Sequence, residues 1–150
     1  MPHLEPVDLV LTDPPYGIGN DGGHFRGRKG DGIRVLPKMG WDKETPTGET
    51  FQMILRAADK KIIWGGNYFT DKLPVSRCWI CWDKCQPWDN FSQFELAWTS
   101  FDKPAVLFKH SNTGGNPEKM KKIHPTQKPE KLYRMCLTKF AEVGDSILDT

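Results

Sequence analysis

Residues 13–16, Asp-Pro-Pro-Tyr, combine groups suited to holding the exocyclic amine of a nucleic-acid base. Such an amine is a poor nucleophile because its lone pair is delocalised into the ring. An enzyme helps by accepting hydrogen bonds from the NH2 group and holding the nitrogen in line with an electrophile. Asp13 offers a carboxylate acceptor, Pro14 and Pro15 stiffen the chain and fix the Pro14 carbonyl, and Tyr16 offers a ring for stacking an extruded base. Four residues alone are equally compatible with a turn.

The motif follows a short apolar run at residues 7–12, which predicts a buried strand. The two prolines cannot continue that strand, so we expect Asp13 and Tyr16 at its carboxyl end. Open α/β sheets bind their ligands at this end of their strands. The pattern therefore indicates a site rather than a turn alone.

The remaining pattern predicts strands at residues 61–64, 77–82, 94–100, 105–109 and 146–150, with the third and fourth of these paired as an antiparallel hairpin. Helical spacing occurs at residues 49–59 and again after residue 129, where Gly144 is the expected stop and the apolar face holds Leu132, Met135, Cys136, Phe140 and Val143. We expect one α/β domain over residues 1–150, with a mostly parallel sheet and an antiparallel edge hairpin. Residues 17–48 read as a long, mobile loop.

The chain has 150 residues and a net charge of +2, too small to identify a polyanionic partner. No apolar run approaches the roughly 20 residues that span a bilayer, and there is no signal peptide, so we expect no membrane association and a cytoplasmic location. Period-2 alternation puts Cys78 and Cys81 on opposite strand faces, so we expect no metal site. Two basic clusters are candidates for phosphate contacts or for solvated loops: Arg26, Arg28 and Lys29, and Lys119, Lys121 and Lys122.

The chain resembles the DNA N6-adenine and N4-cytosine methyltransferases of the β arrangement, in which the Asp-Pro-Pro-Tyr motif precedes the cofactor half. Residues 7–17 are similar to the catalytic motif of that family. Residues 64–69, 82–84 and 95–100 are similar to its following strand ends, most of all in small phage or prophage members. Residues 124–129, His-Pro-Thr-Gln-Lys-Pro, are similar to the motif before its cofactor helix, and residues 147–150 to the opening of its glycine loop.

The resemblance implies an incomplete Rossmann-like fold that uses S-adenosylmethionine, with Asp13, Pro14, Pro15 and Tyr16 as the catalytic residues. It implies that Thr126, Gln127 and Lys128 hold the cofactor's carboxylate before a helix, where free N–H groups, the helix dipole and a charge-assisted bond favour an anion. A capped helix with proline in its first turn would also explain these residues, and both explanations can hold together. Asp149 and Thr150 are the remaining expected cofactor residues.

Asp rather than Ser at position 13 favours adenine N6 in double-stranded DNA, with a flipped base, as the target. The resemblance is compatible with a homodimer and with a restriction-modification role. The chain ends before the family's glycine loop, so the alternatives are a catalytically inactive truncated remnant that binds nucleic acid or a partner, or the same chemistry on N4-cytosine or RNA.

Overall fold

The computed structural model describes residues 5–19, 23–26, 33–36, 40–86, 92–111 and 127–150, the second and third of these by their backbone alone. The chain divides into two compact units. The larger unit comprises Met1–Pro14, Pro46–Lys119 and Lys128–Thr150, and the smaller comprises Pro15–Thr45 and Met120–Gln127.

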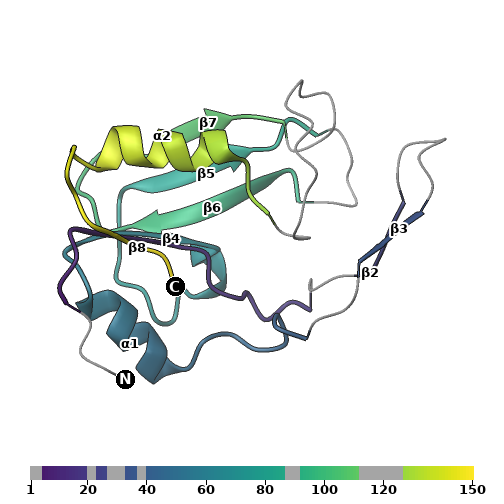
Figure 1. Ribbon diagram of the computed structural model, residues 1–150, viewed down its shortest axis with the longest axis horizontal. Helices are drawn as coiled ribbons and strands as arrows, with labels where there is room; N and C mark the ends of the chain where they lie inside the picture. The colour runs from purple at the N-terminus through teal and green to yellow at the C-terminus, as the bar shows by residue number, and fades with distance from the viewer. Residues whose placement is uncertain (1–4, 20–22, 27–32, 37–39, 87–91, 112–126) are drawn as a thin grey trace. The chain divides into compact units, whose positions relative to one another are not determined.

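A six-stranded sheet forms the centre of the larger unit (Figure 1). Its strand order is β7-β5-β6-β4-β1-β8. Every pairing is parallel except those of β6, which lies antiparallel between β4 and β5. The architecture is therefore α/β with a mostly parallel sheet, as expected. The strands are β1 (Leu9–Thr12), β4 (Lys60–Trp64), β5 (Trp79–Asp83), β6 (Phe94–Thr99), β7 (Val106–Lys109) and β8 (Ile147–Leu148).

The predicted antiparallel edge hairpin is wrong. β6 and β7 are not neighbours, because β5 lies between them and pairs in parallel with β7. Burial explains the difference: Ala97 and Trp98 of β6 are both buried, so this strand needs cover on both faces and takes an interior position. Leu107 of β7 is largely exposed, which suits the edge of the sheet.

Helix α2 (Glu130–Phe140) packs against one face of the sheet. Its buried residues, Leu132, Cys136 and Phe140, are spaced four apart and so lie on one side of the helix. They contact alternate strand residues such as Leu9, Leu11, Ile62, Trp64, Ile80 and Trp82, which share a face because successive strand side chains point to opposite sides.

Helix α1 (Gly48–Arg56) begins at Thr47, whose hydroxyl accepts a hydrogen bond from the Thr50 amide. It buries Phe51 and Ile54, and the Phe51 ring lies 4.9 Å from that of Phe69. These residues are not part of the α2 cluster, and Figure 1 shows the two helices on opposite sides of the strands. A short 3-10 helix, η1 (Gly66–Tyr68), follows β4.

Helix α2 ends four residues before the predicted stop at Gly144, and Val143 lies beyond the helix and is fully exposed. The Asp145 carboxylate accepts a hydrogen bond from the Glu142 amide at 3.0 Å, and the Asp145 amide donates to the Glu142 carbonyl at 3.2 Å. These bonds close a turn in which Gly144 has a φ of +102°. The glycine therefore serves the turn after the helix rather than the helix end.

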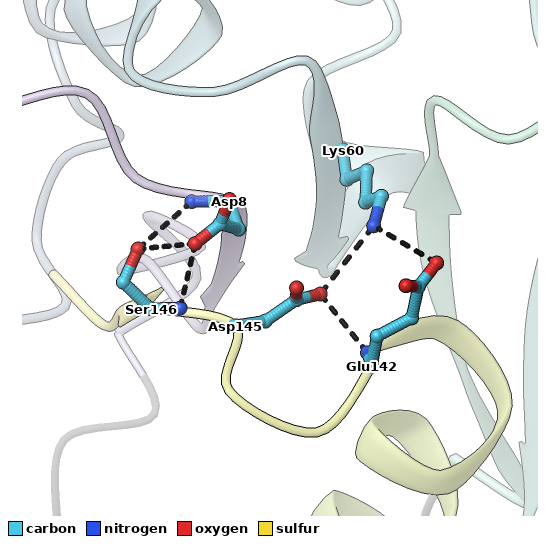
Figure 2. Close-up of polar contacts among 5 residues, drawn as sticks. All are labelled: Asp8, Lys60, Glu142, Asp145 and Ser146. Carbon is cyan, nitrogen blue, oxygen red and sulfur yellow. Dashed lines mark hydrogen bonds and ion pairs between the residues drawn. The ribbon is translucent and has the colours of Figure 1, made fainter.

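That turn is fastened to the amino ends of the strands (Figure 2). The Asp8 carboxylate accepts hydrogen bonds from the Ser146 amide at 2.8 Å and the Ser146 hydroxyl at 2.6 Å. Lys60 forms an ion pair with Asp145 at 3.4 Å. The contacts hold β8 beside β1, although β8 has only two residues.

The smaller unit contains an antiparallel pair, β2 (Gly23–Arg26) and β3 (Ile33–Leu36), within the segment that we expected to be loop throughout. Asp42, which is buried, accepts a hydrogen bond from the Gly17 amide through its carboxylate and one from the Gly19 amide through its carbonyl, both at 2.8 Å. These bonds join the segments that precede and follow the strand pair in the sequence.

Candidate functional site

Residues from four strand ends gather at one edge of the large sheet. Asp13 follows β1, Trp64 ends β4 and Lys84 follows β5. Because β6 runs antiparallel, its first residues lie at the same edge, and Glu95 pairs with Trp82. This is the carboxyl edge of the parallel strands, where open α/β sheets place their ligand sites.

Four charged side chains of alternating sign form a chain of ion pairs at this edge: Asp13, Lys128, Glu95 and Lys84. Lys128 Nζ contacts Asp13 Oδ2 and lies 3.3 Å from Glu95 Oε2. The other carboxylate oxygen of Glu95 lies 2.6 Å from Lys84 Nζ. The side chains of Lys128 and Lys84 are only 4% and 11% exposed, so their charges depend on these partners.

A tryptophan ring lies near each of the two lysines that form these ion pairs. Lys128 Nζ lies 5.6 Å from the centre of the Trp64 ring, and Lys84 Nζ lies 5.5 Å from that of Trp82. Both distances fall within the range of cation–π attraction. Each ammonium is therefore held by carboxylate on one side and by an aromatic face on another.

Burial opposes ionisation of Glu95, but the Lys128 and Lys84 ammonium groups outweigh it, and the pKa of Glu95 lies below its ordinary value. Glu95 is therefore anionic at neutral pH and remains paired with both lysines.

The end of β8 brings a second carboxylate to Asp13. β8 runs parallel to β1, and the Thr12 hydroxyl hydrogen-bonds the Thr150 hydroxyl at 2.7 Å. Burial and the Asp13 charge raise the pKa of Asp149, against the opposing effects of the Thr150 amide and Lys128. Burial and the neighbouring Asp13 charge thus disfavour the ionised form of Asp149, and a nearby cation would favour it.

Tyr133, in the first turn of α2, lies near enough to Asp13 and Asp149 to be affected by their charges. Burial raises the pKa of its hydroxyl strongly, with the charges of Asp13 and Asp149 adding to the effect. The hydroxyl therefore remains protonated and available as a hydrogen-bond donor at neutral pH. Nothing in the helical spacing distinguished Tyr133 from an ordinary core residue.

The structure brings together the predicted site residues Asp13, Lys128, Asp149 and Thr150. Pro14 is buried beside Asp13, whereas Pro15, Tyr16 and Gln127 belong to the smaller unit and are half-buried. Arg26 is the last residue of β2. The other predicted residues lie outside the described part of the chain, namely Thr126, Arg28, Lys29, Lys119, Lys121 and Lys122.

The family resemblance covers the segments around Glu95 and Lys84 but implies no role for either residue. The available signal was a charged residue among apolar neighbours, since Glu95 stands in the run Phe-Glu-Leu-Ala-Trp at residues 94–98. A buried carboxylate at such a position needs a partner. Its partner was not readable because Lys128 is distant in the sequence.

Within the described ranges, no three His, Cys, Asp or Glu side chains are grouped in a way that would hold a metal ion, and all four cysteines are free. The helices in those ranges are also too short or too polar to cross a membrane.

Comparison with known protein families found no family model that matches this chain, and comparison with curated proteins found no significant match.

Proposed function

We propose that this chain is the catalytic part of an S-adenosylmethionine-dependent DNA methyltransferase that acts on an exocyclic base amine, adenine N6 first among the candidates. The proposal includes a Rossmann-like methyltransferase fold, with which the α/β sheet is compatible. The observation that carries it is the position of Asp13, at the carboxyl edge of the sheet, in contact with Lys128 and beside Asp149.

Asp13 would accept a hydrogen bond from the target NH2 group, and the Pro14 carbonyl would accept a second. These bonds favour a pyramidal nitrogen whose lone pair points at the methyl carbon. Tyr16 would stack on the extruded base. S-adenosylmethionine supplies a methyl group on a positively charged sulfur. On transfer, an N–C bond would form as the C–S bond breaks with its electron pair going to sulfur, and the amine would lose one proton to solvent.

The described residues fit such a cofactor by charge. S-adenosylmethionine carries a sulfonium, and a cation near Asp149 would oppose the burial and the Asp13 charge that raise the pKa of this carboxylate. Lys128 places a positive charge beside Asp13, and this charge would attract the carboxylate of the cofactor. Asp149, Thr150 and Lys128 are the residues that we expect to hold it, together with Gln127 and Thr126.

The test is transfer of a labelled methyl group from S-adenosylmethionine to double-stranded DNA by the purified chain, with the modified nucleoside identified by mass spectrometry. We expect N6-methyladenine. Asp13→Asn should lower the rate by about 100- to 1000-fold, because the carboxylate acceptor is lost. Asp102→Asn, an exposed carboxylate paired with Arg77, is the matched control and should retain activity.

DNA binding without any methyl transfer would contradict the proposed function and favour a non-catalytic nucleic-acid-binding role. Label found as N4-methylcytosine, or in RNA instead of DNA, would keep the chemistry and change the substrate. Equal loss in the Asp13 and Asp102 variants would remove the role assigned to Asp13.

A further inference from the structure

Glu95 occupies the middle of the ion-pair chain at the site. One carboxylate oxygen lies 2.6 Å from Lys84 Nζ and the other lies 3.3 Å from Lys128 Nζ. Lys128 in turn contacts Asp13. Glu95 can therefore influence the position of the Asp13 carboxylate through Lys128.

The position of Lys128 Nζ depends on the charges around it. A lysine ammonium is a point charge at the end of a flexible four-carbon stem, so its location is set by the groups that hold it. Here Asp13 holds it on one side, Glu95 on another, and the Trp64 ring faces it at 5.6 Å. Without the charge of Glu95, the attraction of Asp13 would shift the Lys128 ammonium toward Asp13.

We propose that Glu95 is a positioning residue for methyl transfer: it holds Lys128 in place so that the Asp13 carboxylate stays oriented toward the target amine, and Lys84 holds Glu95. This inference rests on the proposed function, since that function gives Asp13 its role. Glu95 needs no contact with the base or the cofactor for this role.

Lys84 supports Glu95 electrostatically as well as geometrically. The two lysines together lower the pKa of a carboxylate whose burial would otherwise raise it. Lys84 also lies against the Trp82 ring, and its side chain is 11% exposed, so it has little freedom to leave. Lys84 thus holds one oxygen of the Glu95 carboxylate closely, and Lys128 attracts the other oxygen.

Glu95→Gln tests the inference because it keeps the shape of the side chain and removes its charge. We expect kcat to fall by about 100-fold, the effect of a small misplacement of a reacting group, with little change in KM for DNA. Glu95→Asp, which keeps the charge on a shorter stem, should recover part of the loss. The control is Glu130→Gln, an exposed carboxylate paired with Arg134 on α2, which should leave kcat unchanged.

A second measurement does not depend on activity. NMR of lysine side chains labelled with 13C and 15N reports on the Lys128 ammonium, whose signal is assigned by its absence in Lys128→Met. We expect this signal to move in Glu95→Gln and to stay in Glu130→Gln. A purely structural Glu95 would lower stability in Glu95→Gln while kcat of the folded variant remained at the wild-type value, and that result would overturn the inference.

The two proposals fail separately. An unmoved Lys128 signal in Glu95→Gln overturns the positioning role whatever the activity of the wild-type chain. A wild-type chain that transfers no methyl group overturns the proposed function and with it the catalytic consequence of Glu95, even where the Lys128 signal moves.

Discussion

The ammonium of Lys128 contacts the carboxylate of Asp13, although the two residues come from opposite halves of the chain. Sequence reasoning assigned them to different ligands, Asp13 to the target base and Lys128 to the cofactor. Their contact joins the end of β1 to the residues that precede α2. The same lysine also contacts Glu95, so a single buried cation serves two carboxylates.

Loss of Lys128 is expected to destabilise the fold as well as the site. Lys128→Met would leave Asp13 and Glu95, whose side chains are 24% and 22% exposed, without their shared cation. Removing one partner of a buried ion pair costs about 3 kcal/mol or more. Urea unfolding measures this cost. Lys139→Met, at an exposed position on α2, should stay within about 0.5 kcal/mol of the wild type, and an equal effect of both variants would contradict the prediction.

Asp149→Asn is expected to stabilise the folded chain at neutral pH while weakening cofactor binding. Burial and the Asp13 charge raise the pKa of Asp149 above its ordinary 3.8, so the folded state favours the protonated acid. The contribution of protonated Asp149 to the free energy of unfolding is fully present below pH 3.8. It is lost as the pH rises through the folded-state pKa. The amide side chain of the variant would be neutral at every pH, so the variant would not lose this free energy of unfolding as the pH rises. Unfolding at pH 3 and pH 7, with calorimetric titration of S-adenosylmethionine, measures both effects, and a variant less stable than the wild type at pH 7 would contradict the first.

The Asp8–Ser146 contact is expected to make the β8 attachment sensitive to acid (Figure 2). Hydrogen bonds from the Ser146 hydroxyl and amide lower the pKa of Asp8 below 3.8. Its contribution is therefore present above pH 3.8 and is lost as the pH falls through the lowered folded-state pKa. The difference in unfolding free energy between wild type and Asp8→Asn should be largest near neutral pH and shrink below pH 3.8. A difference that is constant from pH 2 to pH 7 would show that the charge of Asp8 has no part in it.

Gly66→Ala is expected to destabilise the turn that follows β4. A Cβ at this position would lie 2.7 Å from Trp98 Cβ and 2.9 Å from the Trp98 backbone nitrogen, which cannot give way without moving β6. Overpacking of this kind costs about 1–3 kcal/mol. Thermal or urea unfolding measures it. Gly48→Ala, where a Cβ meets nothing within 4 Å, is the control and should be neutral or stabilising by up to about 1 kcal/mol.

Much of the local structure was readable from the sequence. The prolines after residue 13 ended β1 where predicted, and the apolar spacing of Leu132, Cys136 and Phe140 predicted the buried face of α2. The spacing failed at Val143, because the turn closed by Asp145 ends the helix earlier. Strand existence was also readable, since β-branched and aromatic runs marked each strand of the large sheet.

Pairing was not readable in the same way. Two successive strands joined by a short connection usually pair, and this rule predicted the hairpin of β6 and β7. The sheet instead places β6 in its interior, because the burial of Ala97 and Trp98 on both faces outweighs the short connection. That order is also what brings Glu95 to the carboxyl edge.

The sequence by itself determined the residue types and the strand and helix ends at which Asp13, Lys128 and Asp149 stand, because proline, glycine and apolar periodicity act over a few neighbouring residues. Only the tertiary structure decided which charges meet. Ion pairs between Asp13, Lys128, Glu95 and Lys84 join four separate segments, and their distances follow from the antiparallel insertion of β6 and the docking of α2. Both depend on burial over the whole sheet, which no local pattern encodes.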